Sequence, residues 1–476
     1  MKSLKQIIVL PLLLCGFILT AQKSKADIIK GIDKGYDKYA SVAKQIWDYA
    51  EMGYQEYKSS ATLIDLLSEE KFSIQKNVAD IPTAFVAEYG SGGPVIAILG
   101  EFDALPGLSQ KAQASKESAG GIGGHACGHH LFGTASSAAA IAVKNYIKAN
   151  KIEATIRFYG TPAEEGGGAK VYMARAGLFD DVDAVIHWHP GASNDASEGA
   201  ALANISAKFR FSGISSHAAA APEKGRSALD GVEAMNYMVN MMREHVPQET
   251  RIHYVITDGG KAPNVIPDFA EVYYYSRHNS RDVVRDVFNR IVLAAEGAAK
   301  GTETEMSYEI VNGVHEMLPN TTLQKVMYEN LNAIGGFAYT SSEKTFADQI
   351  AQSMGMSEAD VATALEVQPY KSAGRAFGST DVGDVSFVAP TVGLRTATWV
   401  PGTPAHSWQA VAAGGTSIGF KGMMVAARTM ASTIIDLLDQ PEYLRDAQNE
   451  FEKRRGADFK YVPLLGDRPP ALDYRN

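Results

Sequence analysis

The apolar run at residues 95–99 limits the fold of this 476-residue chain more than any other feature. It is continuously apolar and follows a glycine-rich turn, as expected of a strand that is covered on both faces. Strand-like segments recur at 155–159 and 183–186, and helical patterns at 135–147 and 169–176 lie between the strands. This alternation predicts an α/β fold, with a mostly parallel sheet flanked by helices.

A change of pattern near Ala203 predicts a second domain. Residues 207–211 alternate between apolar and polar side chains, as in a strand with one exposed face. The segments that follow have the order helix, strand, strand, helix, at 227–245, 253–257, 270–275 and 281–298. This order predicts a compact α+β domain inserted into the larger one.

The insertion divides the larger domain into two parts. From about His315 the chain returns to helical sequence, and it ends with strands and a long helix at 420–438. The predicted divisions are a signal peptide at 1–22, a first part of the larger domain at 27–202, the inserted domain at 203–313, and a second part of the larger domain at 314–476. The segment after Pro463 is predicted to be loose.

The N-terminus has the three parts of a secretory signal peptide. Residues 1–5 are positively charged, residues 7–20 are almost wholly apolar, and polar sequence returns after Ala21. The apolar part is short for a membrane span, and an uncleaved anchor is the alternative. We therefore expect an exported protein, periplasmic or secreted, with no membrane contact beyond this segment.

The charge balance and the cysteines narrow the possible functions further. Lys and Arg number 45 against 54 Asp and Glu, a net charge of −9, which argues against nucleic-acid binding. Of the 2 cysteines, Cys15 would leave with the signal peptide, and Cys127 would have no partner for a disulfide. Cys127 is then a buried bystander, an intermolecular linker or a metal ligand.

The segment 123–130 carries the strongest chemical signal in the sequence. Cys127 and His129 are separated only by Gly128, which permits a tight turn directly before a helix. A thiolate and an imidazole this close suit a metal such as Zn²⁺, which would also lower the pKa of the thiol. A catalytic Cys–His nucleophile pair and a simply packed cysteine are the alternatives.

Other candidate residues follow the predicted strands. Glu164 and Glu165 come after 155–159, and because adjacent side chains diverge, one can bind metal while the other handles protons. His187 and His189 share one face of the strand at 183–186, and His189 is nearer its end. Asp103 leaves another strand end, where it could orient a ligand imidazole.

The carboxyl ends of parallel strands meet at one edge of a sheet, where α/β proteins bind their ligands. These groups are therefore expected to lie together. His406, in a turn-rich loop, is a weak candidate by itself.

Together the motifs resemble the co-catalytic metallopeptidase and amidohydrolase superfamily of aminoacylases and carboxypeptidases, and most of all its p-aminobenzoyl-glutamate hydrolase branch. The resemblance runs from about Trp47 to Trp408. Its motifs are Glu101-Phe-Asp-Ala-Leu-Pro106, His125-Ala-Cys-Gly-His129, Gly160-Thr-Pro-Ala-Glu-Glu-Gly-Gly-Gly168, Trp188-His-Pro190, Pro263-Asn-Val-Ile-Pro-Asp268, Gly378-Ser-Thr-Asp-Val-Gly-Asp-Val-Ser386 and Gly402-Thr-Pro-Ala-His-Ser-Trp-Gln409.

The resemblance implies a centre of two divalent metal ions, Zn²⁺ or Mn²⁺, with Glu164 as the general base. The implied metal ligands are Cys127, His129, Glu165, His189 and His406. His130 stands where relatives carry Asp or Asn, and we expect it to replace a hydrogen-bonding group rather than to add a ligand.

The resemblance also implies a role for the inserted domain as a lid that forms a homodimer. His217 would stabilise the oxyanion, in its own subunit or across the dimer. Asn264 and Arg277 would face the carboxylate of the substrate. Arg277 and Arg375 are both candidates for the cation that a glutamate side chain would need.

The implied activity is hydrolysis of the amide bond of an acylated amino acid. The substrate would be a small molecule such as p-aminobenzoyl-glutamate, an N-acyl amino acid or a dipeptide. A hydroxide formed at the metal ions would attack the carbonyl, with Glu164 taking the proton. Two alternatives stay open: an inactive binding protein with the same fold, and an amidase that uses Cys127 as its nucleophile.

Overall fold

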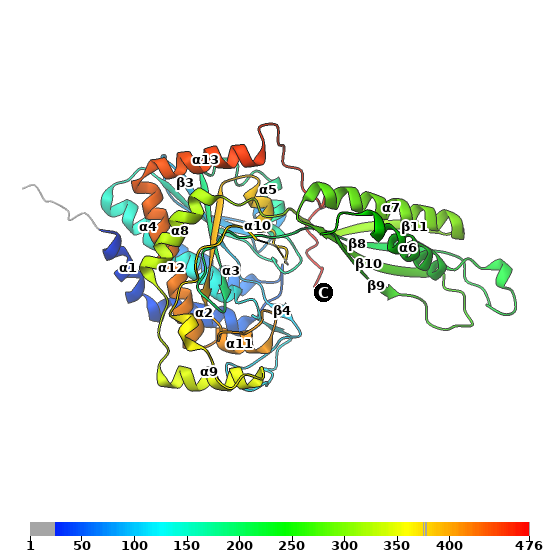
Figure 1. The fold of residues 1–476 in the computed structure, drawn as a ribbon, viewed down its shortest axis with the longest axis horizontal. Coiled ribbons are helices and arrows are strands. Elements are labelled where there is room, and N and C mark those ends of the chain that lie inside the picture. The colour runs from blue at the N-terminus through cyan, green and yellow to red at the C-terminus, as the bar shows by residue number, and fades with distance from the viewer. Residues whose placement is uncertain (1–23, 375, 377, 476) are drawn as a thin grey trace, which may run out of the picture.

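The chain forms a larger domain and an inserted domain that projects from it (Figure 1). The computed structural model describes residues 24–374, 376 and 378–475. The predicted signal peptide and Arg375 lie outside the described residues. Among the described helices, none is long and apolar enough to cross a membrane.

A six-stranded sheet forms the centre of the larger domain. In spatial order its strands are β1 (Ser73–Lys76), β2 (Phe85–Gly90), β6 (Thr155–Gly160), β3 (Val95–Gly100), β7 (Ala184–Gly191) and β12 (Thr391–Ala397). The pairs β6–β3, β3–β7 and β7–β12 are parallel, whereas β1 and β2 run antiparallel at one edge. This mixed sheet with a parallel centre confirms the predicted fold class.

Helices cover the sheet, and the two longest in this domain pack on each other. The helices α4 (His129–Asn150) and α12 (Ser417–Asp439) contact one another and the central strands. Nearly every residue of α4 from His129 to Ile147 is buried, which its small, alanine-rich side chains permit. The remaining helices of this domain are α1 (Lys25–Lys34), α2 (Tyr36–Tyr49), α3 (Tyr57–Glu69), α5 (Ala169–Arg175), α8 (Thr321–Ile334), α9 (Ser341–Ser353), α10 (Val382–Ser386), α11 (Trp408–Gly414) and α13 (Pro441–Arg455).

The inserted domain is an antiparallel sheet with two helices packed against it. In spatial order its strands are β11 (Glu305–Val314), β8 (Ala203–Ser212), β10 (Phe269–His278) and β9 (Arg251–Asp258), and its helices are α6 (Ala228–Met242) and α7 (Arg281–Thr302). Our sequence interpretation omitted β11. Most of its side chains are exposed or only half-buried, so that its sequence lacks a strong apolar alternation.

The C-terminal tail, which we define as residues 456–475, is not loose as the sequence predicted. Leu464 is buried in the apolar core of the inserted domain, and Arg468 donates hydrogen bonds to the carbonyls of Ile310 and Val311. At the other end, the ring of Tyr474 lies 5.6 Å from that of Tyr54 in the larger domain. The tail therefore contacts both domains, and it runs between them in Figure 1.

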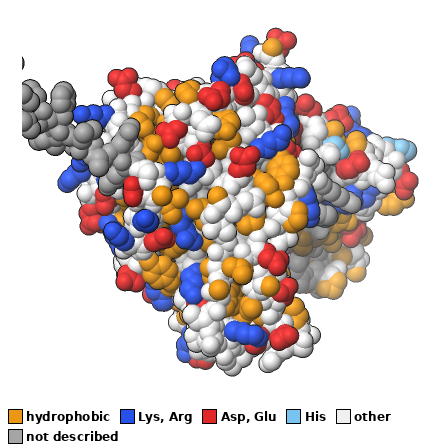
Figure 2. Space-filling view, turned by 60° about the vertical axis from the view of Figure 1, so that its left-hand side comes forward, with side chains coloured by type: hydrophobic (Ala, Val, Ile, Leu, Met, Phe, Trp, Pro, Cys, Tyr) orange, Lys and Arg blue, Asp and Glu red, His pale blue; other side chains and the backbone are white. Residues whose placement is uncertain are grey.

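The surface of the larger domain carries mixed charges. On the face in Figure 2, basic and acidic side chains are interspersed with hydrophobic ones, and neither sign of charge forms a large patch. Although the chain has a net charge of −9, acidic side chains do not gather in one patch on this face.

Candidate metal centre and substrate cleft

The polar groups that follow the parallel strands come together at one edge of the sheet. Asp103 follows β3, the Glu164–Glu165 pair follows β6, and His189 lies near the end of β7. Cys127 precedes α4, whose first residue is His129. The parallel strands thus bring these groups to their common carboxyl end, as the sequence predicted.

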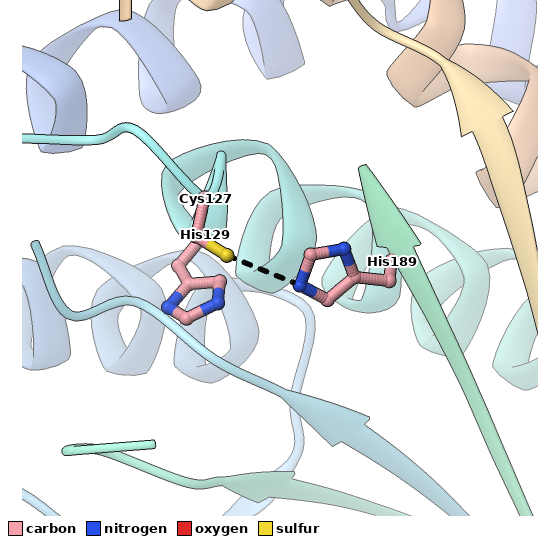
Figure 3. Close-up of side chains that lie close together, drawn as sticks. All are labelled: Cys127, His129 and His189. Atoms are coloured by element: carbon pink, nitrogen blue, oxygen red, sulfur yellow. Dashed lines mark hydrogen bonds between the residues drawn. The ribbon is translucent and has the colours of Figure 1, made fainter. Parts of the chain in front are cut away.

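Two groups of possible ligands share the Cys127 thiol. One contains Cys127, His129 and His189, the other contains Cys127, Glu165 and His406, and within each group the ligand atoms lie within 4.8 Å of one another. The Sγ atom lies 3.5 Å from Nε2 of His189 and 3.5 Å from Nε2 of His406. Figure 3 shows the thiol and the His189 ring facing each other. Cys127 is therefore the donor that these two groups have in common.

The donor atoms of these groups fit divalent cations. Nε2 of His129 and Oε1 of Glu165 are buried and make no hydrogen bond. Their nearest charged neighbours are Glu101, 3.1 Å from Nε2 of His129, and His406, 3.4 Å from Oε1 of Glu165. Burial and the nearby Glu165 raise the pKa of the Cys127 thiol, so without a cation it is protonated. A bound cation would favour the thiolate instead.

Asp103 connects the ligands of both groups. Its Oδ1 lies 2.8 Å from Nδ1 of His129, and its Oδ2 accepts a hydrogen bond from the backbone N–H of Glu165 at 2.9 Å. Burial acts to raise the pKa of Asp103, but His129 holds it below its ordinary value. A charged Asp103 orients the His129 ring so that Nε2 faces the other donors.

Glu164 lies beside Glu165 in a strained loop. Ala163 before it has a φ of 53°, in the left-handed region that non-glycine residues avoid. The backbone N–H of Ala163 donates to the buried Glu56 at 2.8 Å, which holds the loop in this conformation. Burial and then the neighbouring Glu101 raise the pKa of Glu164 well above its ordinary value.

A buried ion network, absent from our sequence interpretation, lies against this centre. Lys170 is fully buried, and its Nζ lies 2.7 Å from Glu101 and 2.7 Å from Asp381. The other oxygen of Glu101 lies 3.1 Å from Nε2 of His129. Glu101 and Asp381 stand inside the quoted motifs, but nothing local in the sequence connects either of them to Lys170.

Two histidines near the centre lie outside every candidate ligand group. His187 packs against Gly393 of β12, where an added Cβ would lie 2.3 Å from its ring, and burial lowers its pKa to about 3. Nε2 of His130 lies 3.0 Å from the carbonyl oxygen of Gly414. His130 therefore makes a hydrogen bond and belongs to no candidate ligand group, as the sequence analysis predicted.

A cavity of about 920 Å³ opens between the two domains beside the candidate centre. Glu164, Glu165 and His406 line it from the larger domain. Arg277 lines it from the inserted domain and Arg475 from the C-terminal tail. Because the candidate ligands Glu165 and His406 line it, this cavity is the candidate substrate cleft.

His217 and Asn264 do not line this cavity. Both lie in loops beyond β8 and before β10, at the end of the inserted domain remote from the larger one (Figure 1). The two loops are joined by a hydrogen bond from Ala218 N to Asn264 O of 3.0 Å, and the His217 side chain is exposed. A single chain therefore leaves both residues far from its own candidate centre.

Comparison with known proteins connects these features to one family. The model of the M20 peptidase dimerisation domain matches residues 202–303. The chain is 40% identical to one of the p-aminobenzoyl-glutamate hydrolase subunits of Escherichia coli over 467 residues, covering 92% of this chain and 97% of the relative. The chain belongs to the M20 family of amide-bond hydrolases.

Other known proteins resemble the chain in sequence or in fold. The Xaa-Arg dipeptidase of Mus musculus is 28% identical over 437 residues, covering 88% of this chain and 90% of the relative. An aminobenzoyl-glutamate utilization protein from Klebsiella pneumoniae has a TM-score of 0.60 and 17% identity, covering 86% of this chain and 98% of its own. A dinuclear metal-binding M20 peptidase from Bacillus subtilis has a TM-score of 0.59 and 18% identity, covering 86% of this chain and 99% of its own.

Proposed function

We propose that this M20 enzyme binds two divalent cations and hydrolyses the amide bond between an acyl group and an amino acid, with p-aminobenzoyl-glutamate as the first candidate substrate. The observation that carries the proposal is the pair of donor groups that share Cys127. The 40% identity to the Escherichia coli p-aminobenzoyl-glutamate hydrolase chain supports the choice of substrate.

The donor atoms also bear on the metal. Thiolate and imidazole donors favour Zn²⁺, and the carboxylate donor also admits Mn²⁺. The two cations would supply Lewis-acid activation of water and of the scissile carbonyl.

Glu164 is our candidate for the residue that moves protons. It lines the cleft and adjoins Glu165, while Asp103 and the Glu101–Lys170 pair hold the neighbouring groups in place. In the proposed reaction its carboxylate receives the proton of the attacking water and passes it to the leaving amine.

We propose that a second copy of the chain completes the site. Among the described strands of the inserted domain, β9 lies at an edge of the sheet, and its Val255 is 56% exposed. Tyr237, on helix α6 of the same domain, is 69% exposed. An apolar strand edge of this kind favours pairing with another chain. In such a dimer, His217 and Asn264 would reach the partner's cleft.

A substrate panel with controlled metal content tests the proposed function. The enzyme is stripped with EDTA, loaded with Zn²⁺ or Mn²⁺, and assayed on p-aminobenzoyl-amino acids, N-acetyl-amino acids and dipeptides. We expect activity only after loading, and the highest kcat/KM on p-aminobenzoyl-glutamate.

Other outcomes favour the alternatives. Activity that survives EDTA but is lost on alkylation of Cys127 would favour a cysteine nucleophile. Binding of substrates with no turnover by the metal-loaded protein would favour an inactive binding protein.

We also propose that the protein is exported. Cell fractionation followed by mass spectrometry of the mature chain checks this, and we expect a product cleaved near Ala21. A cytoplasmic product that retains residues 1–22 would contradict the proposal.

A further inference from the structure

We infer that the C-terminal tail forms a wall of the substrate cleft and that Arg475 recognises a second carboxylate on the substrate, so that acidic amino acids are preferred. This inference rests on the proposed function and names the chemical class of its amino-acid product. The contacts that attach the tail to the cleft do not involve the side chains of the candidate metal ligands.

The end of the tail is attached to the loop that carries the candidate base. The Tyr474 hydroxyl donates to the backbone carbonyl of Glu165 at 3.1 Å, and Nη2 of Arg475 donates to the same carbonyl. A Cβ on Gly53 would lie 2.1 Å from the Tyr474 hydroxyl, so that Tyr474 fits closely against the larger domain. These contacts place the Arg475 guanidinium at the cleft beside the candidate metal centre.

Four cationic side chains line the cavity, and they differ in their partners. Lys208 lies 3.7 Å from Glu271, and Arg468 lies 3.3 Å from Glu309. The other two, Arg277 and Arg475, form no ion pair with any Asp or Glu in the described part of the chain. In both, Nε is buried and has no hydrogen-bond partner.

The carboxylates that line the cavity do not neutralise these two arginines. Asp381 is paired with Lys170, and Glu309 is shared by Arg210 and Arg468. Glu165 is a candidate metal ligand, Glu164 is the candidate base beside it, and the Asp473 side chain is exposed on the tail. Among the described residues, no carboxylate neutralises these two guanidinium groups. Each lies over a tyrosine ring, Arg277 over Tyr275 and Arg475 over Tyr474.

Guanidinium groups that are not paired with an Asp or Glu are suited to bind the carboxylate of a ligand. A guanidinium with unsatisfied N–H donors binds a carboxylate in a bidentate way, and a partly buried cation is costly without such a partner. Every amino-acid product has one α-carboxylate, which Arg277 would receive. A second cation on a different element, Arg475 on the tail, fits a substrate with a second carboxylate, as in glutamate or aspartate.

The test compares substrates that differ only in this charge. Arg475→Ala, Arg475→Lys and the wild type are assayed on p-aminobenzoyl-glutamate and on p-aminobenzoyl-glutamine, which has the same shape and a neutral side chain. Arg475→Ala should lower kcat/KM for the glutamate compound by roughly 10- to 150-fold, mainly through KM, as expected for a lost hydrogen bond to a charged group. The glutamine compound should lose much less, because it loses only the support that Arg475 gives to the Glu165 carbonyl. Arg475→Lys should recover part of the loss on the glutamate compound.

The matched control is Arg445→Ala, which removes an exposed arginine on α13 that pairs with Asp446. It should leave both substrates unchanged. Equal losses on both substrates with Arg475→Ala, or no loss on either, would overturn the inference.

A binding measurement separates this inference from the proposed function. Calorimetric titration of the metal-loaded protein with L-glutamate and L-glutamine needs no turnover. If the wild type hydrolyses neither substrate, the proposed function fails. The inference then stands if glutamate binds more tightly than glutamine and Arg475→Ala removes the difference, and it is wrong if the two amino acids bind equally.

Discussion

The two domains present their candidate functional residues in opposite ways. In the larger domain, His129 is fully buried, and Asp103 holds it with a hydrogen bond of 2.8 Å. In the inserted domain, His217 is exposed, and its Nδ1 only accepts local N–H donors from Ala219 and Ala220. The candidate ligand His129 is thus held in place within a single chain. His217, in contrast, lies far from the candidate metal centre of its own chain.

The two sheets also differ in how far their strands are buried. The centre of the larger domain's sheet is covered by helices, and Ile96, Ile98 and Ile186 are fully buried. The sheet of the inserted domain ends at β9, where Val255 and Ile256 are exposed. Burial therefore fixes the candidate ligands Cys127 and His129, whereas we expect the exposed part of the site to depend on association with a second chain.

The largest effect should come from the buried part of the site. Glu164→Gln keeps the shape of the side chain but removes its capacity to accept a proton. We expect kcat to fall by roughly 10²–10⁴-fold, with the metal content unchanged by elemental analysis. Glu165→Gln is the matched control, because it should lower the metal content as well. Activity that persists in Glu164→Gln would show that another group is the base.

Breaking the buried ion network should cost more stability than breaking an exposed ion pair. Lys170→Met leaves Glu101 and Asp381 without their cation, and we expect a loss of about 3–5 kcal/mol in the free energy of unfolding. The control is Arg226→Ala in the inserted domain, where the exposed pair with Glu303 should contribute about 0–1 kcal/mol. Urea denaturation measures both, and similar losses would contradict the contrast between the domains.

His217 tests whether the exposed part needs a second chain. His217→Ala should lower kcat by about 10²–10³-fold, as for a lost oxyanion donor. Mixed dimers of the His217→Ala and Glu164→Gln chains decide where it acts. If His217 serves the partner's cleft, one site of each mixed dimer is intact and activity returns. If mixing restores nothing, His217 does not act across a dimer.

The smallest effect, when it is counted per pH unit, concerns the dependence of stability on pH. Burial raises the pKa of Asp384 to about 7 from an ordinary value of 3.8, even though it accepts hydrogen bonds from His315 N and the Tyr461 hydroxyl. The folded state then binds a proton that the unfolded state has lost. The free energy of unfolding should therefore fall as the pH rises from 3.8 to about 7, by up to about 1.4 kcal/mol per pH unit relative to Asp384→Asn.

A half-buried carboxyl in the inserted domain should show the opposite sign. Lys261 and the Gly260 N–H lower the pKa of Asp258, so its contribution should be lost as the pH falls below its ordinary value. Urea denaturation of Asp258→Asn, with the pH series extended below 3.8, is the matched control. A difference between wild type and Asp384→Asn that does not change with pH would contradict the assignment of the buried proton.

The fold class and the position of most candidate residues follow from the sequence alone. Continuous apolar strands and periodic helices are local patterns, and they predict an α/β sheet whose strand ends meet. Cys127 and His129 stand two residues apart, and Glu165 follows a strand, so their proximity could be argued without coordinates. The strand β11 was missed because its half-exposed side chains carry little apolar pattern.

The meeting of groups that are distant in the sequence is a property of the tertiary structure. His406 lies 279 residues from Cys127, and a φ of 59° in its loop helps to bring its ring to the thiol. Lys170 meets Glu101 and Asp381 only because three separate elements pack together. The tail reaches the cleft as irregular backbone. Its sequence therefore has no apolar periodicity from which its position could be predicted. Local periodicity encodes elements, whereas these contacts depend on how the elements pack, and that packing is a property of the whole chain.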